Sequence, residues 1–365
     1  MAETLKGLVL SGGKGTRLRP ITHTSAKQLV PVGNKPILFY ALEALVAAGI
    51  EDIGIVTGET AAEVEAAVGD GSAFGARCTY IHQEAPLGLA HAVLTARDFL
   101  GGSPFVMYLG DNLVRHGIVP VVEEFRATRP DAMILLARVP EPQHFGVAEL
   151  EEGRVVRLVE KPAVPRSDLA LVGVYLFTAA IFEAIERIDY SARGELEITD
   201  AIQQLIEMGK DVRPHIISAA HEAEVATWKD TGRLEDLLEA NRIVLDDMRP
   251  RMDGQVGEDV RLEGKVVIEA GAELRNCTIR GPAIVGRGTV VEDAYVGPYT
   301  SISAGCTILG AEIEHSIVLE GARIEHTDGK IESSLIGRGC LIHRSPVRPR
   351  AYKLMLGDHS VVELR

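Results

Sequence analysis

The segment Leu8-Val-Leu-Ser-Gly-Gly-Lys-Gly-Thr-Arg-Leu-Arg-Pro20 runs from an apolar stretch into a glycine-rich turn with three basic side chains. Glycines let a backbone approach a phosphate closely and point its N–H groups at the oxygens, and neighbouring bases add charge-assisted hydrogen bonds. The turn is no P-loop, because Lys14 is followed by Gly15 and lacks the required spacer after an earlier glycine. Leu18 stands where a dinucleotide fingerprint needs its third glycine. The segment therefore predicts a strand that ends in a phosphate-binding turn.

Apolar runs alternate with stretches of helical spacing through the first half of the chain. Strands are expected at residues 5–10, 53–56, 79–82, 105–109 and 133–139. Helices are expected at residues 37–48, 61–68, 89–99 and 118–128. Such alternation predicts an α/β domain in which helices cover both faces of a mainly parallel sheet. Ligands bind at the carboxyl ends of such strands, where the segments 11–19, 83–88 and 110–112 lie.

A second region begins after a predicted helix at residues 233–246. The segment Met248-Arg-Pro-Arg-Met-Asp-Gly254 interrupts the helical pattern, so we expect domains at residues 1–247 and 248–365. Beyond this break an aliphatic residue recurs every six positions, which is typical of a β-helix whose short strands stack aliphatic side chains inside a prism. The predicted interior positions are Val256, Leu262, Ile268, Leu274, Ile284, Val290, Val296, Ile302, Ile308, Val318, Ile324, Ile336 and Ile342, with Lys330 in one slot.

Two steps in this series, from 274 to 284 and from 308 to 318, span ten residues rather than six. We expect the four extra residues of each step to bulge out as loops at corners of the coil. Residues 345–365 break the period and are expected to cap its end. A β-rich domain with accidental spacing is the alternative interpretation.

The composition limits the possible partners. A net charge of -14 argues against nucleic-acid binding. Residues 1–35 nevertheless carry six Lys or Arg side chains against one acid, which suits a small polyanion. The longest mainly apolar stretch, residues 172–182, is shorter than the roughly 20 residues that cross a bilayer, and the first residues lack the features of a signal peptide. We therefore expect a cytoplasmic protein without a membrane partner, with its four cysteines buried as reduced thiols.

Several further segments support a family resemblance. Three segments follow one another near the start of the chain: Gly12-Gly-x-Gly-Thr-Arg-Leu-x-Pro20, Lys27-Gln-Leu-Val-Pro-Val32 and Asn34-Lys-Pro36. Together they resemble the signature of the sugar-1-phosphate nucleotidyltransferases. Further matches are Gly88-Leu-Ala90 after Gln83, Gly110-Asp-Asn112, Phe145-Gly-Val147, Glu160-Lys-Pro162, Gly173-Val-Tyr175 and Trp228-Lys-Asp-Thr-Gly232. These segments are most similar to those of the long form of the glucose-1-phosphate thymidylyltransferases. The resemblance implies a Rossmann-like domain with a mixed, mainly parallel sheet, followed by a left-handed parallel β-helix.

The resemblance also implies a reaction. An oxygen of glucose 1-phosphate would attack the α-phosphorus of dTTP in line with the departing pyrophosphate, and dTDP-glucose would be the product. A phosphate monoester has a second pKa of about 6, so the nucleophile is already ionised near neutral pH and needs no general base. The site must bring two anions together and neutralise the developing charge, which is a matter of positioning and electrostatics.

By resemblance, four residues would be catalytic: Arg17 and Lys27 at the triphosphate, Lys161 at the sugar phosphate, and Asp111. Asp111 would bind Mg²⁺ together with Asp230. Two aspartates are enough, because Mg²⁺ usually takes one or two carboxylates plus phosphate oxygens and water. The alternative for Asp230 is an N-cap of the helix that begins near residue 231.

The resemblance assigns the remaining site residues to the substrates. Glu160 would accept hydrogen bonds from sugar hydroxyls, and Gln83 with the backbone at Gly88 would hold the pyrimidine. The other substrate-binding positions are Leu10, Gly12, Gly13, Gly15, Thr16, Gln28, Asn112, Gly146, Lys161, Gly173 and Tyr175. Phe145 stands where many relatives have a tyrosine, which puts a sugar contact by that ring in doubt.

Other functions stay open at this point. The nucleotide and sugar could instead be UTP and N-acetylglucosamine 1-phosphate, since no residue decides between them. The β-helix could be a second, acetyltransferase site, although His315, His326 and His343 lie in no recognisable motif. A catalytically silent relative would have lost a loop base or a metal-binding aspartate, and this chain keeps them. We expect small-molecule substrates, no nucleic acid, and a homo-oligomer whose contacts cover the coil.

Overall fold

The computed structural model describes residues 4–13, 15–23, 25–217, 228–345 and 359–363. Its contacts divide the chain into two compact units. The first unit comprises Met1–Lys14, Ala26–Leu29 and Ile37–Asp230, and the second comprises Gly15–Ser25, Val30–Pro36 and Thr231–Arg365. Lys14 and most of the predicted C-terminal cap, residues 346–358 and 364–365, lie outside the described residues. Within the described part, no helix has both the length and the apolar character to cross a membrane.

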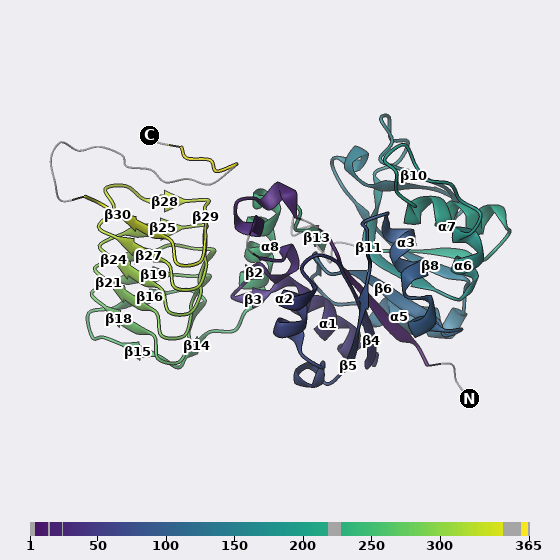
Figure 1. Ribbon diagram of the computed structural model, residues 1–365. Helices are drawn as coiled ribbons and strands as arrows, with labels where there is room; N and C mark the ends of the chain where they lie inside the picture. Colours follow the sequence, from purple (N-terminus) through teal and green to yellow (C-terminus); the bar gives the residue numbers. More distant parts are fainter. Residues whose placement is uncertain (1–3, 14, 24, 218–227, 346–358, 364–365) are drawn as a thin grey trace. The chain divides into compact units, whose positions relative to one another are not determined.

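The first unit is built on one nine-stranded mixed sheet (Figure 1). The main path runs β10-β9-β11-β6-β1-β4-β5, and β8 pairs with both β11 and β12. The strands are β1 (Lys6–Ser11), β4 (Asp52–Thr57), β5 (Arg77–His82), β6 (Phe105–Leu109), β8 (Ala132–Arg138), β9 (Gly146–Glu151), β10 (Arg154–Glu160), β11 (Leu169–Phe177) and β12 (Val212–Ile216). Neighbours β6, β1, β4 and β5 are parallel, whereas β11 runs antiparallel to β6, β8 and β9. The predicted mixed α/β fold is confirmed.

Helices cover both faces of this sheet because successive strand residues point to opposite sides. Leu8 and Leu10 belong to one apolar core and Val9 between them to another, and none of the three is more than 8% exposed. The helices are α1 (Ile37–Ala47), α2 (Ala61–Val68), α3 (Leu89–Thr95), α4 (Arg97–Leu100), α5 (Val119–Thr128), α6 (Ala180–Ile185) and α7 (Ile198–Glu207). The single helix expected at residues 89–99 is two helices, since the backbone leaves helical geometry at Ala96.

The second unit contains a parallel β-helix of three sheets, drawn green to yellow in Figure 1. One sheet holds β14 (Arg251–Met252), β17 (Val266–Ile268), β20 (Ala283–Val285), β23 (Thr300–Ile302), β26 (Ile317–Val318) and β29 (Leu335–Ile336). The next holds β15 (Gln255–Val256), β18 (Glu273–Arg275), β21 (Val290–Glu292), β24 (Thr307–Leu309), β27 (Arg323–Glu325) and β30 (Leu341–His343). The third holds β16 (Arg261–Glu263), β19 (Thr278–Arg280), β22 (Tyr295–Val296), β25 (Glu312–Glu314) and β28 (Ile331–Glu332). The predicted parallel β-helix is confirmed.

The interior of the coil differs from the predicted series at three aliphatic positions, of which Val256, in the first turn, is 39% exposed. Val285 and Val291 line the interior core, and neither Ile284 nor Val290 does. The two long steps are not loops, because Ile279 and Ile313 fill them as interior residues of β19 and β25. In each pair the neighbouring residue is also aliphatic, so the sequence period alone could not fix the phase.

Other side chains on the coil also depart from expectation. Lys330 lies outside, where its ammonium pairs with Glu314, and Ile331 next to it packs against the interior core. The expectation of buried thiols holds for Cys277 and Cys306, but Cys340 is exposed and Cys78 of the first unit is half-buried.

Helix α8 (Leu234–Asp247) belongs to the second unit and packs on the outside of the coil. Leu245 contacts Val267 and Ile284, which explains why Ile284 faces outward. Asn241 of α8 is fully buried and joins three segments. Its Oδ1 accepts hydrogen bonds from the backbone N–H of Gly33 at 2.8 Å and from Ser301 Oγ at 2.9 Å, and its Nδ2 donates to the carbonyl of Tyr299 at 3.0 Å.

Gly33 lies between β2 (Pro31–Val32) and β3 (Lys35–Pro36), which form a two-stranded hairpin. At its tip, Asn34 Nδ2 donates to the carbonyl of Ile302 at 2.7 Å. The hairpin that follows the Lys27 segment is therefore held to the coil by two amide side chains.

We predict that Asn241→Ala lowers the free energy of unfolding by about 2–4 kcal/mol, because the buried partners of the amide lose their hydrogen bonds. Chemical denaturation followed by circular dichroism measures this loss. Gln255→Ala is the control, since Gln255 is an exposed amide residue of the same unit. Equal stabilities of the two variants would contradict the role given to Asn241.

Candidate active site

The carboxyl ends of the parallel strands bring the predicted loops together in the first unit. The N–H of Gly110, after β6, donates to the carbonyl of Leu10 in β1 at 2.9 Å. The N–H of Gln83, after β5, donates to the carbonyl of Thr57 in β4 at 2.8 Å. Gly12 lies so close to Gly58 that a Cβ on Gly58 would meet the Gly12 carbonyl at 3.1 Å. The glycine turn, the Gln83 segment and the Asp111 segment therefore share one edge of the sheet.

Two aspartates flank one ammonium group at this edge. Lys27 Nζ donates a hydrogen bond to Asp111 Oδ2 and lies 4.0 Å from Asp230 Oδ1. The two carboxylates converge because β7 (Asn112–Val114) pairs antiparallel with β13 (Trp228–Asp230), which sets Asp230 opposite Asn112. Residues far apart in the chain thus approach the same cation.

Asn112 holds this arrangement in place. It is only 2% exposed, its Nδ2 donates to Asp111 Oδ1 at 2.9 Å, and its Oδ1 accepts from Trp228 Nε1 at 2.5 Å. Burial acts to raise the pKa of Asp111, but the Lys27 ammonium and the hydrogen bonds from Lys27 and Asn112 outweigh it and lower that pKa. Asp111 is therefore a carboxylate at neutral pH.

The structure excludes the capping alternative for Asp230. Helix α8 begins at Leu234 with Arg233 at its N-cap position, and Asp230 lies in β13. Among the described residues no three His, Cys, Asp or Glu side chains are grouped to hold a metal ion. The two converging carboxylates still fit a cation such as Mg²⁺ that takes its other ligands from phosphates and water.

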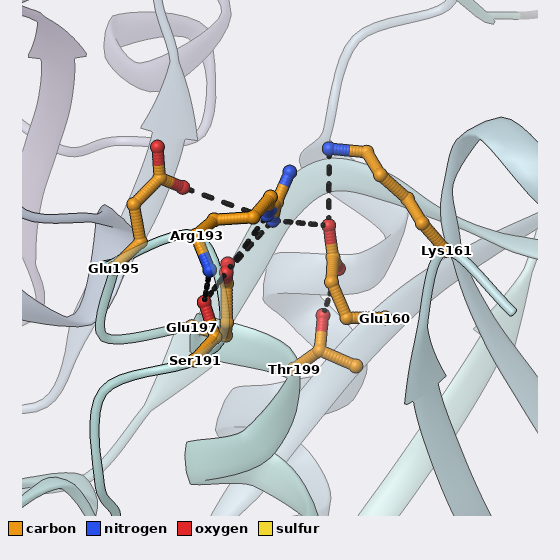
Figure 2. A network of polar contacts seen from close by, with 7 residues as sticks. All are labelled: Glu160, Lys161, Ser191, Arg193, Glu195, Glu197 and Thr199. Carbon is orange, nitrogen blue, oxygen red and sulfur yellow. Dashed lines mark hydrogen bonds and ion pairs between the residues drawn. The ribbon is translucent and has the colours of Figure 1, made fainter.

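A second polar network surrounds Glu160 at the end of β10 (Figure 2). Its Oε1 lies 3.2 Å from Lys161 Nζ and 3.0 Å from Arg193 Nη2, and its Oε2 accepts a hydrogen bond from Thr199 Oγ1 at 2.7 Å. Figure 2 shows the Lys161 and Arg193 side chains converging on the same end of Glu160. The Lys161–Glu160 ion pair is therefore part of a larger network.

Arg193 and its anchor Glu197 belong to none of the sequence motifs and were not predicted as site residues. The Glu197 side chain is 6% exposed and accepts from Arg193 Nη2 at 2.8 Å and from Ser191 Oγ at 2.7 Å. Burial tends to lower the pKa of Arg193, but Glu197, Glu160 and Glu195 raise it overall, so the guanidinium stays charged. In the sequence, only the alternation of basic and acidic residues just before α7 could have indicated that these two side chains form an ion pair.

Two predicted glycines lie where a side chain would collide with this polar framework. A Cβ on Gly146 would meet Thr199 Oγ1 at 2.8 Å and Glu160 Oε2 at 3.2 Å. A Cβ on Gly173 would meet Asn112 Oδ1 at 2.8 Å. Tyr175 is buried, and its burial followed by the charge of Glu160 raises its pKa.

The other predicted residues of the first unit line the glycine turn. Gln28 is buried beside Gly13, where a Cβ would lie 3.6 Å from Gln28 Nε2. Within the described residues Gln28 Oε1 has no hydrogen-bond partner, which suits a ligand-binding position. The Leu10 side chain is in the core, so this residue faces the site only through its backbone.

Three predicted residues belong to the second unit. Gly15 precedes a short 3₁₀ helix, η1 (Thr16–Leu18), that carries Thr16 and Arg17. Thr16 and Arg17 are exposed, and the Gly15 carbonyl accepts from Thr22 Oγ1 at 2.6 Å. Their roles at the triphosphate stay predictions.

A glycine turn beside paired carboxylates at the carboxyl edge of an α/β sheet defines a phosphate-binding class of protein. A profile described as nucleotidyl transferase matches residues 6–247. The chain belongs to the nucleotidyl transferase family.

Two relatives that match this chain over nearly its full length carry the same name. A glucose-1-phosphate thymidylyltransferase from Streptomyces griseus is 57% identical over 361 residues, 99% of each chain. Another from Streptomyces antibioticus is 54% identical over 363 residues, 99% of this chain and 100% of the other. A Bacillus anthracis structure, provisionally named a glucose-1-phosphate thymidylyltransferase and solved with a sucrose, is 36% identical with a TM-score of 0.61. It covers 68% of this chain and 98% of its own.

We predict that Gly146→Ala weakens the binding of a sugar 1-phosphate by about tenfold or more, because the added Cβ displaces Glu160 and Thr199. Isothermal titration calorimetry measures the affinity. Gly102→Ala is the control, since a Cβ there meets nothing within 4 Å. If both variants bind like the parent chain, the Glu160 network is not the sugar-phosphate site.

Proposed function

We propose that this chain transfers a thymidylyl group from dTTP to glucose 1-phosphate, giving dTDP-glucose and pyrophosphate. One observation carries the proposal: Asp111 and Asp230 flank the Lys27 ammonium at the edge of the sheet where the glycine turn lies. A metal ion that bridges to the triphosphate would need two carboxylates placed close together in this way. The names of the two Streptomyces relatives support this nucleotide and sugar over UTP and N-acetylglucosamine 1-phosphate.

Mg²⁺ bound by Asp111 and Asp230 would neutralise charge on the triphosphate. Lys27 lies between these carboxylates and would donate to the phosphate oxygens that enter beside it. Asn112 would keep Asp111 oriented through its own hydrogen bond from Trp228. Gly12, Gly13 and Gln28 line the turn that would receive the triphosphate, and Arg17 would add a further cation.

The second network would bind the sugar phosphate. Lys161 and Arg193 both contact the same oxygen of Glu160, so an incoming phosphate would find two cations side by side. As those cations turn to the phosphate, Glu160 Oε1 would accept hydrogen bonds from sugar hydroxyls, while Thr199 still holds Oε2. Because the sugar phosphate is already a dianion near neutral pH, no side chain has to remove a proton from it.

Other predictions complete the proposal. Residues 1–247 would form the catalytic domain and residues 248–365 the β-helix domain, which the family match over 6–247 supports. We favour a structural role of the β-helix over acetyl transfer. The His315 ring packs against the Tyr299 ring with 5.0 Å between their centroids, and the two Streptomyces relatives are named for thymidylyl transfer alone. Cytoplasmic location, the identity of the metal as Mg²⁺ and homo-oligomerisation stay predictions.

We expect the purified chain with Mg²⁺ to release pyrophosphate fastest when supplied with dTTP and glucose 1-phosphate. A panel of four nucleoside triphosphates crossed with several sugar 1-phosphates, followed by a coupled pyrophosphate assay, measures kcat/KM for each pair. No release with any pair would favour a catalytically silent protein instead.

Asp111→Asn should lower kcat by about 100-fold or more, because the neutral amide is a weaker metal ligand and no longer pairs with Lys27. Circular dichroism should show an unchanged fold. Asp98→Asn, at an exposed position of α4, is the control and should keep the parent rate. A parent-like rate for Asp111→Asn would remove Asp111 from the metal site.

A further inference from the structure

The side chain of Gln83, at the end of β5, is held by two neighbours from the start of α3. Gln83 is 9% exposed. Its Nε2 lies 3.4 Å from the carbonyl oxygen of Gly88 and 2.9 Å from His91 Nδ1. His91 is a half-buried residue of α3 that no motif in the sequence singled out.

The Gly88 carbonyl indicates which end of the Gln83 amide is the NH₂ and which is the oxygen. A carbonyl oxygen can only accept, so the amide group that faces it must be the NH₂ and not the oxygen. The carbonyl is itself immobile, because it accepts from the N–H of Ala92 at 3.2 Å. Gly88 has φ +107, and a Cβ there would meet the Leu196 carbonyl oxygen at 2.3 Å, so the backbone is tightly constrained.

His91 supplies the stronger of the two contacts. At 3.4 Å the bond to Gly88 is near the outer limit of a hydrogen bond, whereas 2.9 Å to His91 is the usual length. For Nδ1 to accept, the imidazole must be neutral with its proton on Nε2. His91 therefore contributes most to holding the side-chain amide of Gln83 in this orientation.

The locked amide presents one kind of atom toward the glycine turn. With Nε2 bound to Gly88 and His91, Oε1 points to the other side, where a Cβ on Gly12 would lie 3.5 Å from it. An amide oxygen accepts and cannot donate. A base that enters beside Gly12 must therefore offer Gln83 a hydrogen.

We propose that His91 is a positioning residue that fixes the Gln83 amide so that its Oε1 selects a pyrimidine with a hydrogen on N3. Thymine carries that hydrogen, whereas N3 of cytosine is a bare acceptor and would meet Oε1 lone pair to lone pair. A site built to pair with a hydrogen rejects an analogue that lacks it. This inference rests on the proposed function, and it adds the residue that decides between dTTP and dCTP.

The test compares kcat/KM for dTTP and dCTP, each with glucose 1-phosphate, in His91→Ala and His91→Phe. Both variants remove the acceptor, and the second keeps a ring. Only the long 3.4 Å contact to the Gly88 carbonyl then holds the amide, so the amide turns its NH₂ toward the base more readily. The dTTP to dCTP ratio should therefore fall about tenfold, the worth of one hydrogen bond. KM for dTTP should rise with little change in kcat.

Two further variants separate positioning from packing. His91→Gln restores an acceptor and should recover most of the ratio. His116→Ala, at an exposed position, should keep the parent ratio. A parent-like ratio in both His91→Ala and His91→Phe, or an equal loss for the two nucleotides, would overturn the inference, as would a parent chain that uses dTTP and dCTP equally. Failure of the proposed function is distinct, because the parent chain would then release no pyrophosphate from dTTP.

Discussion

The approach of two carboxylates to one cation is the constraint on which the rest of the site depends. Asp111 and Asp230 would repel each other without a positive charge between them, and here the Lys27 ammonium supplies it. The pairing of β7 with β13 brings them together, and the buried Asn112 ties that pairing to the carboxylate through Trp228 and Asp111. A protein that must hold a triphosphate needs such a place, where a further cation can join two fixed acids.

The same arrangement recurs at the Glu160 network with the charges reversed. There one acid, Glu160, holds two cations, Lys161 and Arg193, and the buried Glu197 fixes one of them from behind. We propose that the first network binds a cation with its phosphates and that the second binds an anion. Glycines at 146 and 173 lie against the fixed side chains of both networks, where any Cβ would displace them. Side chains are therefore oriented before substrate arrives, which is how a site based on positioning and electrostatics gains its rate.

Much of this could be predicted from the sequence, because it follows from local patterns. Apolar runs predicted the parallel strands, and the six-residue period predicted the coil. The phase of that period was wrong where two aliphatic residues adjoin, as at Ile284 and Val285, and where Ile331 rather than Lys330 packs against the interior. Motif residues such as Lys27, Asp111 and Asp230 could be listed, but their convergence depends on long-range strand pairing. Arg193 and His91 were missed because neither a period nor a motif encodes a hydrogen bond between side chains of different elements.

The most direct test of the central claim is a double-mutant cycle on Mn²⁺ binding in the presence of dTTP, measured by electron paramagnetic resonance. Asp111→Asn, Asp230→Asn and the double variant would be compared with the parent chain. If both aspartates hold one ion, each single substitution weakens binding and the double variant loses clearly less than the sum of the two. Strictly additive losses, or tight binding that survives either substitution, would contradict a shared metal site.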